Sequence, residues 1–249
     1  MASRAIEDER LESVDLVLGL LELLAGSPRP RSLGDIARAL DISKPRAHRH
    51  LRALVLRDYV RQEEDTDRYE ISAKLLGLGE AVRGRLSFAG AARPAMTRLS
   101  DATGQAVTAS ELVAGQVTIV EMLHGRTLVE FAIRPGTVMD PLLSAHGLIA
   151  LAFGPCLRIL HDAGLTTAPE DELALVRKRG WATAAGRIVT GVNALAAPAF
   201  GHDGAWAGTI AIVGSIDAIP AEPEAVQIEA ILTAARDISA RLGWKGACA

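Results

Sequence analysis

The chain has 249 residues, 49% of them hydrophobic, which is enough apolar material for one large domain or two ordinary ones. Its formal net charge of −3 argues against a protein that is coated with nucleic acid along its whole length. Two cysteines make no disulfide framework, no apolar run reaches the ~20 residues that span a bilayer, and residues 1–10 lack a signal-peptide core. We therefore expect a cytoplasmic protein with no membrane partner.

Two helices are predicted at the start of the chain. Apolar side chains recur at helical spacing over residues 9–25, and Gly26, Pro28 and Pro30 end this first helix. A short second helix follows, with Ser32 as its N-cap and Asp35 in its first turn, where the helix dipole favours negative charge.

A third helix is predicted behind Ser43 as N-cap, with Pro45 in the first turn, where a missing N–H costs nothing. At 100° per residue, its apolar side chains point one way and its arginines point roughly the opposite way. A short helix, a tight turn and a longer helix with a basic face make the helix-turn-helix arrangement. Alternation in residues 59–61 and 68–71 around an acidic turn predicts a β-hairpin, the wing.

Basic residues are concentrated in this part of the chain. Residues 28–61 contain nine basic and three acidic side chains, so the segment has a formal net charge of +6. Phosphate-backbone binding requires such a local basic surface, although charge alone leaves a plain solvated helix face open. A purely structural three-helix domain has little use for the arginines, so we favour DNA binding. The candidate DNA-binding residues are Ser43, Lys44, Arg46, His48, Arg49, Arg52 and Arg68.

The second half of the chain predicts a sheet with helices around it. Residues 105–111, 116–123 and 128–133 alternate like strands, and residues 194–200 and 206–213 predict two more strands that are apolar throughout, with glycine-containing turns between several of them. Residues 74–86 predict a linker helix, Arg93 and Pro94 begin the next helix, and residues 222–242 form a closing helix. The pattern is that of an α+β domain.

Residues 32–51, followed by residues 68–72, resemble the N-terminal domain of the IclR family of bacterial transcriptional regulators. Arg179-Gly-Trp-Ala182, Gly191 and Ala196-Ala-Pro198 resemble its effector-domain signature, and residues 140–147 stand where the family has a glycine-rich turn before a helix. The similarity covers nearly the whole chain, with both halves in the right order.

The resemblance implies an α+β fold of three parts. A winged helix-turn-helix domain would occupy residues 8–73, a linker helix residues 74–90, and an effector-binding and oligomerisation domain residues 91–249. This last domain would be GAF/profilin-like, with a curved antiparallel sheet flanked by helices. The implied partners are double-stranded operator DNA, a small-molecule effector and further copies of the chain in a homodimer or tetramer. We expect no cofactor, no metal and no catalytic residue.

The resemblance also implies an effector cleft between the sheet and the glycine-rich turn. Carried over by position, its lining comprises Ala145, His146, Gly147, Val192, Ala194, Ala211 and Val213. Ala211 and Val213 replace the small polar residues of relatives that bind small polar acids, which predicts a larger or more hydrophobic ligand, such as an aromatic acid. Arg187 stands where the family is often acidic, and either lies on the surface or attracts an anion. His146 either donates to the ligand or is a satisfied structural histidine.

Two other interpretations stay open. A DNA-binding protein whose C-terminal domain only oligomerises would share the fold, but an apolar wall beside a glycine-rich turn favours sensing. An enzyme is disfavoured, because the sequence has no Gly-x-Ser-x-Gly elbow, phosphate-binding loop or dinucleotide fingerprint. Cys156 and His161 lack an evident orienting partner, and the histidines show no paired metal-ligand spacing.

Overall fold

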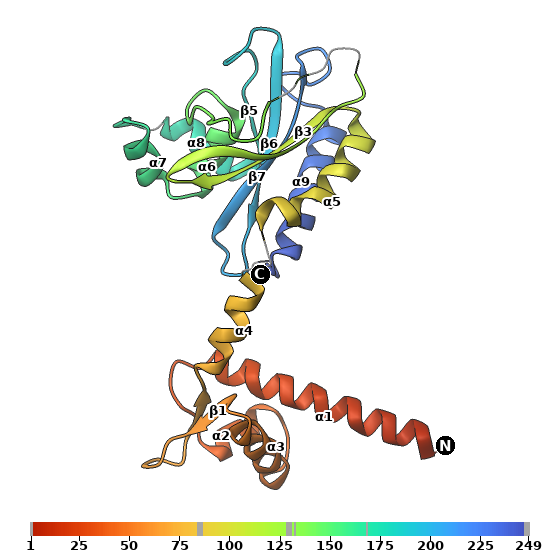
Figure 1. Cartoon of the computed structure of the whole chain (residues 1–249), viewed down its shortest axis with the longest axis vertical. Coiled ribbons are helices and arrows are strands. Elements are labelled where there is room, and N and C mark those ends of the chain that lie inside the picture. The colour runs from red at the N-terminus through yellow and green to blue at the C-terminus, as the bar shows by residue number, and fades with distance from the viewer. Residues whose placement is uncertain (1, 84–86, 128–130, 132, 168, 247–249) are drawn as a thin grey trace. The chain divides into compact units, whose positions relative to one another are not determined.

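The computed structural model describes residues 2–83, 87–127, 131, 133–167 and 169–246 (Figure 1). The chain divides into two compact units, Met1–Arg85 and Leu86–Ala249. The first unit contains, in chain order, α1 (Ala2–Ala25), α2 (Leu33–Ala39), α3 (Lys44–Leu56), β1 (Val60–Gln62), β2 (Tyr69–Ile71) and α4 (Lys74–Arg83). In the described residues, this order is that of a winged helix-turn-helix followed by a further helix.

Serine caps fix the starts of α2 and α3. Ser32 Oγ accepts a hydrogen bond from the backbone N–H of Asp35 at 3.2 Å, and Ser43 Oγ accepts one from Arg46 N–H at 3.4 Å. Each helix then turns its apolar side inward, and β1 pairs antiparallel with β2 beside them. The core of the unit is formed by Leu20, Leu24, Ile36, Leu51, Leu54, Val60 and Tyr69. The winged helix-turn-helix predicted from the periodicity is therefore confirmed.

The second unit is built on one antiparallel sheet. Its strands are β3 (Ala106–Val113), β4 (Gln116–Leu123), β5 (Ala182–Thr183), β6 (Val192–Phe200) and β7 (Trp206–Ser215), in the spatial order β4-β3-β7-β6-β5. The register pairs Ala109 with Ile210 and Leu195 with Ile212, so the first and last parts of the unit meet in the middle of the sheet.

Helices cover both faces of this sheet (Figure 1). α5 (Phe88–Thr103) and α9 (Ala225–Arg241) pack side by side on one face, against Leu195 and Ile212. On the other face, α6 (Ala145–Phe153) and its neighbours α7 (Cys156–Asp162) and α8 (Glu170–Arg179) enclose Ala196 and Ala211. Successive residues of a strand thus serve opposite layers, as the period of two requires. The predicted α+β fold is confirmed.

Some predicted boundaries differ from the structure. The helix predicted to begin at Arg93 begins at Phe88 instead, and Pro94 lies inside it. Ser87 caps this earlier start by accepting from Gly90 N–H at 3.1 Å, and burial of Phe88 stabilises it, which offsets the cost of an internal proline. Of the linker helix predicted over residues 74–90, the structure describes Lys74–Arg83 as helix α4, residues 84–86 lie outside the described residues, and residues 88–90 belong to α5.

Other differences concern strands and the first helix. The strand predicted over residues 128–133 falls partly on residues 128–130 and 132, which lie outside the described residues, and the described Phe131 and Ile133 belong to no strand. β5 was not predicted, because two residues give no periodicity. α1 starts at Ala2, seven residues before the predicted position 9.

Candidate functional site

The exposed face of α3 carries the predicted DNA-contacting residues. Ser43, Lys44, His48, Arg49 and Arg52 are exposed, whereas Ala47, Leu51 and Leu54 on the opposite side are buried. The helix therefore presents a basic surface from a rigid support, which is the geometry that a major groove and its phosphates can accept.

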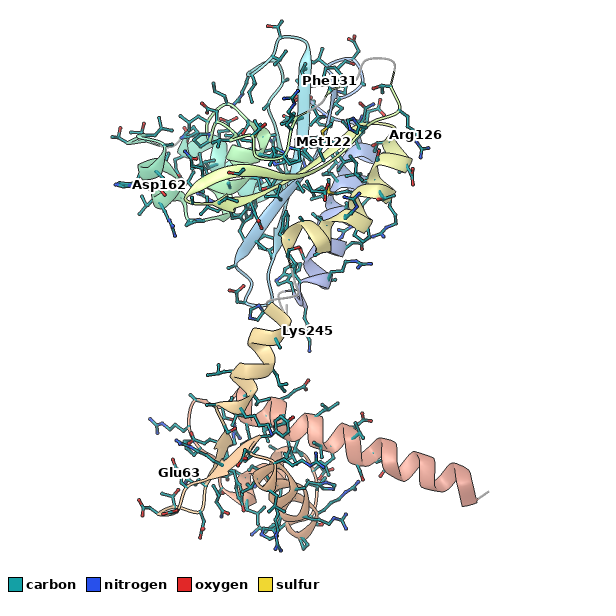
Figure 2. The ribbon with its side chains drawn as sticks, in the orientation of Figure 1. Glu63, Met122, Arg126, Phe131, Asp162 and Lys245 are labelled. Atoms are coloured by element: carbon teal, nitrogen blue, oxygen red, sulfur yellow. The ribbon has the colours of Figure 1, made fainter. Side chains whose placement is uncertain are left out.

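Two of the predicted DNA-binding arginines already have partners within the protein. Arg46 is half-buried, and its Nη2 forms an ion pair with Glu12 Oε2 of α1 at 3.3 Å. Arg68 lies on the wing, beyond the turn that contains Glu63 (Figure 2), and its Nη1 donates to the Pro30 carbonyl at 3.2 Å. Burial, with the charges of Arg49 and Arg46, lowers the pKa of His50, so this residue adds little to the positive charge of α3.

A cavity of about 540 Å³ lies in the second unit, beside α6 and the strands β6 and β7. Its volume is within the range of small-molecule sites. Five of the seven predicted effector residues line it, namely Ala145, His146, Val192, Ala194 and Val213. The structure therefore brings together most of the predicted set, although their contact with an effector stays a prediction.

Gly147 and Ala211, the two remaining predicted residues, do not line this cavity. A Cβ at Gly147 would lie 2.4 Å from both the Asp140 carbonyl oxygen and Pro141 Cα, so glycine is needed there for close packing of α6 on the preceding loop. Ala211 is fully buried in the apolar cluster beneath α6. Both residues therefore belong to the packing around α6 and not to the surface of the cavity.

His146 is fixed by two hydroxyl groups of β3. Its Nε2 lies 2.8 Å from Thr108 Oγ1 and its Nδ1 lies 2.7 Å from Ser110 Oγ. Complete burial lowers the pKa of His146 from 6.5 to about 3, so the ring is neutral at neutral pH. Both ring nitrogens are already bonded, which favours the satisfied structural histidine over a donor to the ligand.

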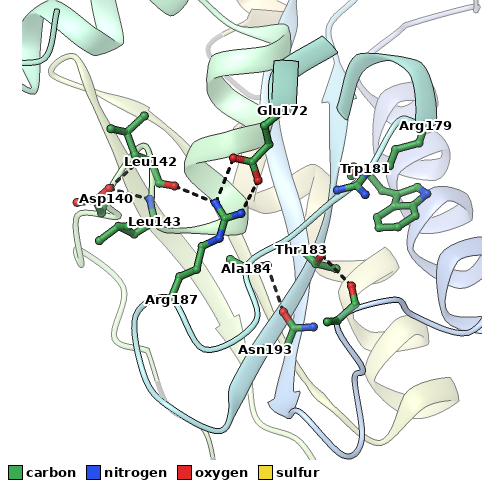
Figure 3. A network of polar contacts seen from close by, with 11 residues as sticks. Asp140, Leu142, Leu143, Glu172, Arg179, Trp181, Thr183, Ala184, Arg187 and Asn193 are labelled. Atoms are coloured by element: carbon green, nitrogen blue, oxygen red, sulfur yellow. Dashed lines mark hydrogen bonds and ion pairs between the residues drawn. The ribbon is translucent and has the colours of Figure 1, made fainter. Parts of the chain in front are cut away.

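The polar lining side chains mostly serve the cavity's own loops (Figure 3). Asp140 Oδ1 accepts from Leu142 N–H at 2.8 Å and Leu143 N–H at 2.9 Å. Ser144 Oγ accepts from Gly147 N–H at 2.8 Å and caps α6. The Asn193 amide holds Ala184 N–H and the Ile219 carbonyl. These bonds stiffen the wall and leave its surface mainly apolar.

Sequence reasoning missed several parts of the lining, including two short segments. Thr137, Val138 and Met139 precede the glycine-rich turn, and Ile188 and Val189 follow Arg187 in the loop between β5 and β6. Ile188 and Val189 are more than half exposed in the structure. The sequence signal that could have located them is a pair of aliphatic residues in a short segment bounded by Gly186 and Gly191. Phe131, labelled in Figure 2, completes this apolar rim.

No helix in the described part of the chain is long and apolar enough to cross a membrane. Among the same residues, no three histidine, cysteine, aspartate or glutamate side chains gather in a way that could hold a metal ion.

Comparisons with known proteins agree with this geometry. Residues 13–64 match the family model of the IclR helix-turn-helix domain, and residues 81–240 match that of the bacterial transcriptional regulator IclR C-terminal domain. The glycerol operon regulatory protein of Streptomyces griseus is 31% identical, over 92% of this chain and 94% of its own length.

Solved structures show the same similarity. Pseudomonas aeruginosa HmgR superposes with a TM-score of 0.76 and 26% identity, covering 94% of this chain and 99% of HmgR. The Agobacterium tumefaciens repressor BlcR superposes with a TM-score of 0.73 and 25% identity, covering 94% and 98%. With both domain models matched in order, the chain belongs to the IclR family of bacterial transcriptional regulators.

Proposed function

We propose that this regulator binds a specific operator through α3 and the wing, and that a largely apolar organic acid bound in the cavity controls this binding. The observation that carries the proposal is the presence of both parts in one chain, an exposed basic recognition helix and a ligand-sized cavity with an apolar wall. We place the protein in the cytoplasm, because bacterial operator DNA lies there.

The DNA part of the proposal assigns roles to individual side chains. Lys44 and Arg52 bind phosphate, and Arg46 and Arg49 read guanine edges, since an arginine fork matches guanine O6 and N7. Arg46 must then break its ion pair with Glu12 before it can contact a base, whereas Arg49 is already exposed. Arg68 contacts the backbone or an adjacent groove from the wing.

The sensing part follows from the apolar wall. Val138, Leu143, Ile188 and Val189 are exposed around the cavity, so a ligand with an apolar body would remove this surface from water. Ligand binding would shift the population of chains competent for the operator. The Streptomyces griseus relative is named for a glycerol operon, which supports control of a metabolic operon here.

Fluorescence anisotropy with DNA from upstream of the protein's own gene, against scrambled DNA at physiological salt, tests the proposal. We expect tight binding that strongly prefers the upstream fragment, and a change in affinity with at least one aromatic or aliphatic acid. Ala194→Leu places a larger side chain into the cavity wall and should remove this response while leaving DNA affinity unchanged.

Each negative outcome of this experiment would contradict a different part of the proposal. Equal, weak binding to both DNAs would overturn operator recognition. Specific DNA binding without any response to an acid would favour the alternative in which the C-terminal domain only oligomerises. A response that survives Ala194→Leu would place the effector outside this cavity.

A further inference from the structure

The charged groups around the cavity are few and unequal. Among the lining residues that the structure describes, Arg187 is the one side chain that carries a positive charge at neutral pH, because buried His146 is neutral. Asp140 is the acidic lining residue, and its Oδ1 is engaged by the Leu142 and Leu143 amides. The side-chain positive charge that could pair with an anion in the described lining therefore belongs to Arg187.

The guanidinium of Arg187 is held in place by hydrogen bonds that engage only some of its N–H groups (Figure 3). Nη2 donates to Glu172 Oε1 at 2.5 Å, and Nη1 donates to Glu172 Oε2 at 3.3 Å and to the Leu142 carbonyl at 3.4 Å. Glu172 lies on α8 and Leu142 on the loop before α6, so two elements fix the plane of the group. These three bonds occupy the outer edge of the guanidinium.

The other edge of Arg187 is available. A guanidinium has five N–H groups, and Nε–H together with the second Nη2–H forms a parallel pair that fits a carboxylate. No described residue accepts a hydrogen bond from Nε. Arg187 lines the cavity, and the bonds of its opposite edge already hold the plane of this donor pair, which lowers the ordering cost of binding an anion.

We propose that Arg187 is the specificity-determining residue of the effector site and that it selects a monocarboxylate with an apolar body. This inference rests on the proposed function and names the ligand class of the same cavity. The carboxylate takes the Nε–Nη2 edge of Arg187, Glu172 keeps the opposite edge, and the apolar rim covers the rest of the ligand.

The same charges disfavour a second carboxylate. Glu172 pairs with Arg187, Asp140 lies on the loop of Leu142, which also bonds Arg187, and the remaining lining is mostly aliphatic. A dicarboxylate would have to place its second charge against another carboxylate or an apolar wall, and either position is unfavourable in a partly desolvated site. The cavity therefore distinguishes one negative charge from two.

Isothermal titration calorimetry on the full chain tests this with matched pairs of probes. The pairs are phenylacetate with phenylacetamide, 3-phenylpropanoate with 3-phenylpropanamide, and 4-methylpentanoate with 4-methylpentanamide, each an acid and its uncharged isostere. We expect at least one acid to bind about tenfold or more tightly than its amide. 1,2-Phenylenediacetate, a dicarboxylate, should bind about tenfold more weakly than that acid.

Variants separate the role of Arg187 from a general loss of stability. Arg187→Gln should reduce the affinity for the acid to that for the amide and leave the affinity for the amide unchanged. Arg187→Lys should keep part of the preference for the acid over the amide, because lysine supplies a positive charge but not the paired N–H donors of a guanidinium. Arg177→Gln is the matched control, since Arg177 also pairs with a glutamate and a backbone carbonyl, Glu170 and Ala152, but does not line the cavity.

The following results would contradict the proposed role of Arg187. Equal affinity for acid and amide, unchanged acid affinity in Arg187→Gln, or tighter binding of the dicarboxylate would overturn the role of Arg187 and leave the proposed function standing. Binding of no member of any pair, acid or amide, would overturn both the inference and the proposed ligand class.

Discussion

The imidazole of His146 depends on two hydroxyl groups that lie far from it in the sequence. A neutral imidazole has one donor and one acceptor nitrogen, and the hydroxyls of Thr108 and Ser110 can complement either tautomer. This arrangement satisfies the hydrogen bonds of a fully buried polar ring beside the cavity. Because the ring is buried, its protonated form is disfavoured. The residue therefore anchors α6 to β3 without adding charge to the wall.

This geometry predicts a pH dependence of stability. The folded pKa of His146, about 3, is depressed below the ordinary value of 6.5, so the unfolded chain binds this proton first as the pH falls. The free energy of unfolding should decrease below pH 6.5, with a contribution from His146 approaching about 1.4 kcal/mol per pH unit. Denaturant unfolding at pH 5.5 and 7.5 measures it.

His146→Phe provides the comparison. This variant leaves two hydroxyls unpaired and should be less stable at pH 7.5, but it should lose part of the decrease toward pH 5.5. His50, whose pKa is also lowered by burial, is unchanged in the variant and so cancels in the difference. An identical decrease in both proteins would show that His146 is not held neutral by the fold.

At the scale of a single element, α3 combines a buried side that fixes its position with an exposed side that is free to read DNA. Arg49 lies near the middle of the exposed side, opposite Ala47, Leu51 and Leu54. If its guanidinium forms the bidentate contact that we propose with guanine, Arg49→Ala should weaken operator binding by about 1–3 kcal/mol and relax specificity at one base pair. Anisotropy with operator variants measures both effects.

Arg57→Ala is the control for Arg49→Ala. Arg57 is also exposed, but it is the C-cap of α3 and lies outside the predicted recognition set. It should change affinity uniformly across DNA sequences if at all. Unchanged operator affinity in Arg49→Ala would remove Arg49 from the recognition surface.

At the scale of the whole molecule, one chain offers one recognition helix, so a pseudo-palindromic operator needs at least two copies. Two α3 helices that enter successive major grooves require half-sites separated by whole helical turns of DNA, about 10–10.5 bp each. Inserting 5 bp between the half-sites should lower affinity by roughly tenfold or more, because the second helix then faces the wrong side of the duplex. Inserting 10 bp should restore most of it. Equal affinity for both insertions would contradict binding by a symmetric dimer.

The elements of the first unit could be predicted because their signals are local. The serine caps at Ser32 and Ser43, the helical spacing of apolar residues and the hairpin alternation each depend on residues a few positions apart. Alternation predicted β3 and β4, and two apolar runs around a glycine-containing turn predicted β6 and β7, whereas β5 is too short to show either pattern. The five residues shared by the predicted and observed cavity lining came from the family resemblance, which carries tertiary information that spacing alone lacks.

The sequence by itself thus determined the winged helix-turn-helix, the α+β class of the second unit and the basic character of α3, because hydrophobic periodicity and charge are properties of neighbouring residues. Only the tertiary structure decided how Arg187 is held by Glu172 and Leu142, how His146 meets Thr108 and Ser110, and why Gly147 must lack a side chain. These contacts join separate elements, and the packing of α6 and α8 on the sheet decides which distant residues meet.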